Sequence, residues 1–156
     1  MNEVRRDLLK SGGGLLALVA AAALARPGSA LAQQWNKAAF ETRNLNDTLR
    51  AMGGTNAAES KDIQFVNPTP DIAENGAVVP VTVTSTIPGT ESIAIMVERN
   101  PNMLSAKFDI PEGTDAFVST RLKMGETSDV IALVKADGKY FYARKEIKVT
   151  LGGCGG

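Results

Sequence analysis

The chain of 156 residues carries 17 basic and 17 acidic side chains, so its net charge at pH 7 is zero, and 44% of its residues are hydrophobic. This balance gives no reason to expect nucleic acid or an anionic membrane as a partner. The sequence contains no histidine, which excludes Cys-His and Ser-His-Asp catalysis and histidine metal sites.

Residues 1–32 contain the three parts of a Tat-type export signal in order. Arg5 and Arg6 form a twin arginine, residues 12–25 form an apolar run, and Ala30-Leu31-Ala32 is a small-x-small cleavage site. A membrane anchor is the alternative, but the run is shorter than the ~20 residues that span a bilayer. We predict export to the periplasm by the Tat pathway, cleavage after Ala32 and no membrane attachment afterwards.

Cleavage would leave 124 residues, enough for one domain with one sizeable core. Because the signal holds four basic and two acidic side chains, the mature chain would carry a net charge near −2. We divide the mature chain into residues 33–151, predicted as a helix followed by a β-sandwich, and residues 152–156, predicted as a flexible arm.

Residues 33–54 are predicted as one helix. Phe40, Leu45, Leu49 and Met52 give an apolar stripe, and the glycines at 53 and 54 end it. We expect this helix to pack on the edge of the domain. The alternative is that the stripe binds a partner protein.

From residue 61 onward the pattern is that of β-strands separated by turns. Strands are expected over residues 63–66, 79–84, 93–97, 104–110, 118–123, 130–135 and 140–151. About seven short strands at this spacing predict a mainly β fold, an immunoglobulin-like antiparallel sandwich. Pro80 has no N–H for the ladder, which predicts an edge or a bulge there. Asp137-Gly138 predicts a two-residue hairpin turn.

The last expected strand leads directly into the arm. Its core-facing set alternates along the chain and consists of Phe141, Ala143, Lys145, Ile147, Val149 and Leu151, with Lys145 as the charged exception. We therefore expect order up to about Leu151. The next five residues are Gly152-Gly153-Cys154-Gly155-Gly156. Fully extended, these five residues reach at most ~17 Å.

Cys154 is the only cysteine, and an odd thiol in an exported protein is either reactive or paired with another molecule. Gly152, Gly153, Gly155 and Gly156 are predicted to make the arm flexible and thin enough to enter another protein's active site. No histidine is present to activate the thiol, and an unperturbed thiol is only about 3% ionised at pH 7. We infer that partner enzymes supply the activation.

Several alternatives remain open at this point. The cysteine could belong to a disordered tail or form an intermolecular disulfide. The protein could instead be a periplasmic β-sandwich binding module with an incidental cysteine, or a sulfurtransferase-like thiol enzyme. Four basic residues could form a docking or anion-steering face, although a solvated strand face is the favoured interpretation. These four are Arg121, Lys123, Arg144 and Lys148.

Several stretches of the chain resemble the SoxY family of sulfur carriers in periplasmic thiosulfate oxidation. The resemblance is most specific at the end, in Lys148-Val149-Thr150-Leu151 followed by the glycine-cysteine arm, and the twin-arginine leader matches as well. It covers nearly the whole mature chain. The other matching stretches are residues 72–81, 88–95 and 134–139.

The resemblance implies a non-catalytic chain that holds sulfur intermediates covalently on Cys154 and carries no cofactor of its own. It implies a heterodimer with a SoxZ-like subunit that has no export signal. We expect the partner surface at the edge beside Pro80 or at the face bearing Phe40 and Leu49. The implied enzymes are a SoxXA-type haem enzyme that attaches thiosulfate, a SoxB-type manganese hydrolase that releases sulfate, and a sulfane dehydrogenase or another sulfur acceptor.

Overall fold

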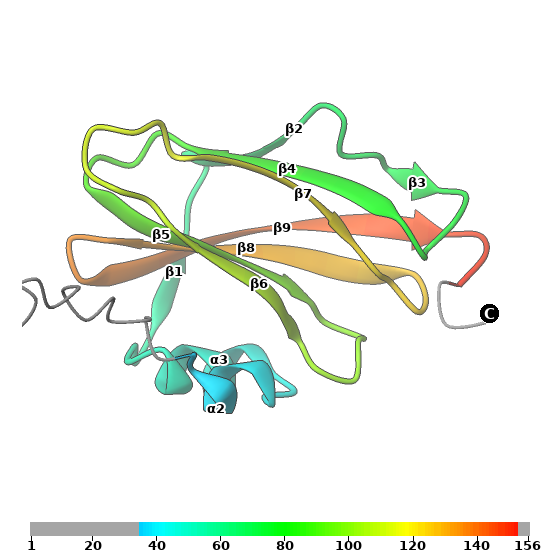
Figure 1. Cartoon of the computed structure of the whole chain (residues 1–156), viewed down its shortest axis with the longest axis horizontal. Helices are drawn as coiled ribbons and strands as arrows, with labels where there is room; N and C mark the ends of the chain where they lie inside the picture. Colours follow the sequence, from blue (N-terminus) through cyan, green and yellow to red (C-terminus); the bar gives the residue numbers. More distant parts are fainter. Residues whose placement is uncertain (1–34, 153–156) are drawn as a thin grey trace, which may run out of the picture. The chain divides into compact units, whose positions relative to one another are not determined.

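The computed structural model describes residues 35–152, in which two β-sheets pack face to face (Figure 1). Helices α2 (Lys37–Phe40) and α3 (Leu45–Ala51) lie on the outer face of the larger sheet. The predicted mainly β sandwich is therefore confirmed. Within the described residues, no helix is both long and apolar enough to cross a membrane.

Nine strands lie within the described residues. The larger sheet has the order β1-β9-β8-β5-β6, with β3 also paired to β9, and the smaller sheet has the order β2-β4-β7. All pairs are antiparallel except those that β1 and β3 make with β9. The strands are β1 (Ala57–Glu59), β2 (Ile63–Val66), β3 (Ile72–Ala73), β4 (Val79–Ser85), β5 (Thr90–Val97), β6 (Leu104–Asp109), β7 (Phe117–Leu122), β8 (Ser128–Ala136) and β9 (Lys139–Val149).

The central strands β5 and β8 are buried on both faces. Ile93 and Ile95 of β5 pack in the core between the two sheets, whereas Ala94 and Met96 pack in the core under the helices. Successive side chains of a strand point to opposite faces, so a strand covered on both sides has no polar face. This explains why β5 and β8 read as continuous apolar runs rather than alternating ones.

The prediction of a single helix over residues 33–54 is wrong, because the described part of this segment forms two short helices. Helix α2 ends at Phe40, and α3 starts only after Asn44. The backbone of Asn44 is extended, and its side chain accepts a hydrogen bond from the N–H of Asp47 at 2.9 Å. An asparagine cap of this kind starts a new helix. The apolar stripe is real, but Leu49 is only 2% exposed and packs on the chain's own sheet. This corrects the prediction of a partner surface at Leu49.

Two local predictions from the strands agree with the structure. Asp137 and Gly138 both have positive φ angles, 48° and 72°, and join β8 to β9 in a two-residue hairpin. Pro80 lies in β4, the middle strand of the smaller sheet, but β2 pairs with β4 only from Thr82 onward. At Pro80 the strand has β7 alone as its neighbour, so the missing N–H leaves no gap in a ladder.

Candidate functional site

The candidate site is the end of β9, from which the chain continues to Cys154. Phe141, Ala143, Ile147 and Val149 pack on the core between the sheets, as the alternation predicts. Leu151 does not, since it is 66% exposed, and its predicted place in the core is wrong. The strand ends at Val149, and the chain turns away from the core before Leu151 is reached.

Lys145, the charged exception on the core-facing side of β9, forms an ion pair with Asp71. The hydrogen bond from Lys145, together with its charge, lowers the pKa of Asp71 below the ordinary value. The stabilisation is therefore present at neutral pH and is lost as the pH falls through that lowered pKa. Because the Asp71 side chain is 86% exposed, the pair contributes little to stability, but it ties the segment before β3 to β9.

Backbone hydrogen bonds hold the chain beyond β9 to two neighbouring segments. The N–H of Thr150 donates to the carbonyl of Ala73 at 3.1 Å, and the N–H of Gly76 donates to the carbonyl of Leu151 at 2.7 Å. On the other side, the N–H of Val149 donates to Thr127 Oγ1 at 2.9 Å. We call residues 71–76 and 123–127 the root clamp. The clamp fixes the main chain as far as Leu151.

Gly152 lies against the backbone of the root clamp. A Cβ atom at this position would approach the carbonyl oxygen of Gly125 to 2.4 Å, closer than real Cβ atoms come to such an atom. Only glycine fits here without movement of one main chain or the other. The predicted role of Gly152 in arm flexibility stays a prediction, and its close approach to Gly125 is a separate reason for a glycine.

The remaining predicted site residues lie outside the described residues. These are Cys154, Gly153, Gly155 and Gly156 in the arm and Arg5 and Arg6 in the export signal. Covalent geometry still bounds where the thiol can go. Only Gly153 lies between Gly152 and Cys154, so the Cα atoms of Gly152 and Cys154 lie at most ~7 Å apart. The thiol is therefore confined to the neighbourhood of the root clamp.

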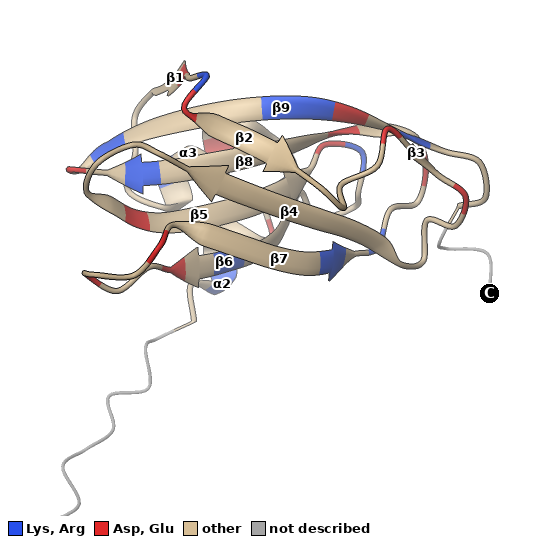
Figure 2. Cartoon of the chain, turned by 90° about the horizontal axis from the view of Figure 1, so that it is seen from above, with Lys and Arg blue, Asp and Glu red and all other residues tan. Residues whose placement is uncertain are grey.

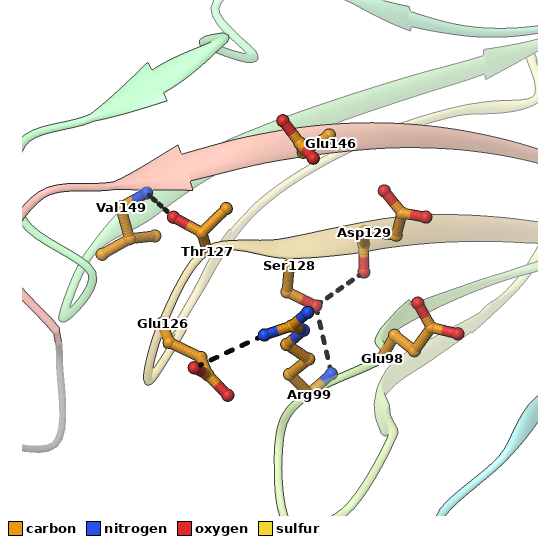
Figure 3. Close-up of a pocket in the computed structure, with 8 residues that line it drawn as sticks. All are labelled: Glu98, Arg99, Glu126, Thr127, Ser128, Asp129, Glu146 and Val149. Atoms are coloured by element: carbon orange, nitrogen blue, oxygen red, sulfur yellow. Dashed lines mark hydrogen bonds and ion pairs between the residues drawn. The ribbon is translucent and has the colours of Figure 1, made fainter.

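A pocket of about 350 Å³ lies beside the end of β9, with Thr127 and Val149 in its lining (Figure 3). Arg99 is its only basic residue, and this side chain pairs with Glu126 at 3.7 Å. The pocket would repel thiosulfate or any anionic group on the arm, because its four carboxylates outnumber the two guanidinium groups that pair with them, those of Arg99 and Arg144. The acidic lining residues are Glu98, Glu126, Asp129 and Glu146. In the described part of the chain, no group of three such residues is placed to hold a metal ion.

The four basic residues singled out in the sequence do not form one surface. Arg121 lies on β7 of the smaller sheet, whereas Arg144 and Lys148 lie on β9 of the larger one (Figure 2). Arg144 is also engaged, since it pairs with Asp129 at 3.4 Å and lies 5.6 Å from the ring centre of Tyr142. The solvated strand face was thus the better interpretation.

The root clamp was missed by the sequence analysis. Strand β3 has only two residues, too few to show an alternating pattern. One available signal was Asn75-Gly76, a turn dipeptide that begins two residues after β3 and whose glycine N–H donates to the carbonyl of Leu151. The loop over residues 123–127 carries no such signal apart from Gly125.

These features define a class of protein: a β-sandwich whose single thiol follows, by three residues, the last residue that the root clamp holds, Leu151. A family model for the sulfur oxidation protein SoxY matches residues 49–154, a range that ends at Cys154. The structure of the sulfur carrier protein SoxY from Chlorobium limicola f thiosulfatophilum is similar, with a TM-score of 0.63 and 39% identity over 74% of this chain and 99% of that one. The chain belongs to the SoxY family.

Other comparisons add little. A superoxide reductase (neelaredoxin) from Ignicoccus hospitalis has a TM-score of 0.48 and 20% identity over 59% of this chain and 82% of that one, too weak a likeness to support an argument. Comparison with curated protein sequences gave no significant match.

Proposed function

We propose that this chain is a covalent sulfur carrier in thiosulfate oxidation and that Cys154 is the attachment point. The observation that supports this most directly is the SoxY-family match, which runs through the clamped strand end to the single cysteine. The root clamp gives the thiol a fixed base. The acidic pocket beside that base does not suit an anionic substrate, which supports a carrier on which other proteins perform the chemistry.

The proposed cycle needs no acid, base or metal from this chain. The Cys154 thiol and thiosulfate form an S–S bond, one proton leaves, and two electrons pass to a SoxXA-type haem enzyme. A SoxB-type manganese hydrolase then adds water to the terminal sulfonate, the bond to the inner sulfur breaks, and sulfate and a proton leave. The persulfide that remains on Cys154 goes to a sulfane dehydrogenase or another acceptor.

The mass of the intact protein tests this proposal. Carrier purified from cells grown on thiosulfate is expected to carry sulfane or sulfonate additions, and peptide mapping should place all of them on Cys154. Carrier from cells grown without reduced sulfur is the control. An unmodified cysteine under both conditions would favour an incidental thiol. Turnover of thiosulfate by the isolated chain would instead favour a thiol enzyme.

Export is expected to depend on the twin arginine. We propose that the mature chain works in the periplasm as a heterodimer with a SoxZ-like subunit that lacks its own signal and is carried out with it. Changing Arg5 and Arg6 to lysine should leave both subunits in the cytoplasm, since the Tat pathway recognises the arginine pair. Fractionation and immunoblotting measure this. A companion subunit that still reached the periplasm in this mutant would contradict export on this signal.

A further inference from the structure

Several exposed apolar side chains lie on or next to the root clamp. Between residues 36 and 152, the large apolar side chains most open to solvent are Ile72, Val78, Phe117 and Leu151, which are 58%, 56%, 54% and 66% exposed. Three of the four belong to the root clamp or the residues next to it. Phe117 lies at the other end of the smaller sheet, because β7 begins there and approaches the clamp only at Leu122.

Main-chain hydrogen bonds and strand pairing bring the three segments that carry these side chains to the same end of β9. Ile72 is in β3 and pairs with Lys148 of β9. Leu151 is bound through its carbonyl to Gly76, and Val78 follows Gly76 by two residues in the same turn. Strand β3 and the loop after it lie beside the end of β9 (Figure 1). We call Ile72, Val78 and Leu151 the apolar collar.

The short distance from Gly152 to Cys154 determines what must touch the collar. The thiol cannot move more than ~7 Å from the clamped glycine, plus its own side chain. An enzyme whose reacting atoms lie inside a cleft can reach the sulfur only if its own surface comes down onto the residues around Gly152. Those residues include the apolar collar.

We propose that the apolar collar is the surface on which the enzymes that modify Cys154 dock, against an apolar rim around the entrance to each active site. This proposal rests on the carrier function proposed above. The occupant is a transient one, because a partner held permanently on the collar would cover the place from which the thiol must enter an active site. Burying three such side chains gives attraction without directional bonds, which suits one surface that must serve several enzymes.

The collar can be tested with the mature carrier loaded with S-thiosulfonate and the purified sulfate-releasing hydrolase. Changing Ile72 and Leu151 together to serine is expected to raise KM about tenfold or more, because the docking contact is lost, with a smaller change in kcat. Alkylation of Cys154 by iodoacetamide should keep its wild-type rate. Phe117→Ser is the matched control, since it removes an equally exposed apolar side chain away from the clamp, and it should behave as wild type.

The outcomes separate the collar from the carrier function. If the double variant keeps the wild-type KM and its loaded thiol is processed normally, the collar is not a docking surface, and the proposed carrier function is unaffected. Loss of the companion subunit from the variant on gel filtration would also overturn the collar proposal, because the collar would then be the heterodimer interface. If the hydrolase releases no sulfate even from loaded wild-type carrier, both the collar proposal and the carrier function are contradicted. If the double variant has a lower melting temperature than wild type, the single variant Val78→Ser provides the same test.

Discussion

Cys154→Ser is expected to abolish thiosulfate oxidation that depends on the carrier while leaving the fold unchanged. A serine oxygen cannot form the S–S bond that holds thiosulfate, so the loss should be complete rather than partial. The position lies beyond Val149, which packs at the edge of the core between the sheets. Thermal unfolding is therefore expected within about 2 °C of wild type, a change below about 1 kcal/mol for a domain of this size.

Two measurements make this test specific. Thiosulfate oxidation is followed in a reconstituted mixture to which wild-type or variant carrier is added last, so that only the carrier differs. Circular dichroism and a melting curve report on the fold of the same preparations. A fall of several degrees in the melting temperature would show that Cys154 contributes to the core, and residual turnover in the variant would show that the thiol is not the attachment point.

The larger strands of the fold were predictable because their side chains are patterned by burial. The β4 alternation of buried Val79, Val81 and Val83 and the hairpin at Asp137-Gly138 each follow from a local rule. Even Pro80 could be interpreted correctly, because a residue without an N–H tolerates few places in a sheet. In these segments the local sequence and the tertiary structure favour the same conformation.

The error at the end of β9 arose because a contact distant in sequence decides the structure there. Leu151 continues the apolar alternation of β9, yet its carbonyl is bound to Gly76, and its side chain is left exposed. Periodicity cannot report such a bond. The helix prediction failed for a different, local reason: the apolar stripe continues on both sides of Asn44, so the prediction did not place a helix start at this asparagine cap.

The candidate site, like the fold, could be predicted only in part from the sequence. A single cysteine among four glycines is unusual enough in composition to be identified without a structure. The surface that determines how other proteins approach that cysteine is built from residues 71–78 and 123–127, roughly 30 to 80 positions earlier in the chain, and no local signal connects them to the arm. The chemistry could thus be predicted, whereas the docking geometry required the fold.

Gly152→Ala is expected to slow every enzyme that acts on Cys154, although the thiol itself is untouched. The new Cβ would lie 2.4 Å from the carbonyl oxygen of Gly125. A backbone oxygen cannot rotate away as the tip of a side chain can, so the end of β9 must shift until the contact reaches normal distance. A displacement of about 1 Å at a reacting group can cost on the order of 10²-fold in rate. We expect a fall in kcat/KM of between about tenfold and that value.

Gly153→Ala is the matched control for this prediction. It adds the same methyl group and removes the same glycine freedom one residue nearer the thiol, so any effect of backbone restriction alone should be as large in this variant. The comparison uses loaded mature carrier with one purified enzyme, and the iodoacetamide rate at Cys154 confirms that the thiol is equally reactive in both. If the two alanine variants lost activity equally, the contact between Gly152 and Gly125 would have no part in presenting the thiol. A loss confined to Gly152→Ala would show that the enzymes depend on where the root clamp places the start of the arm.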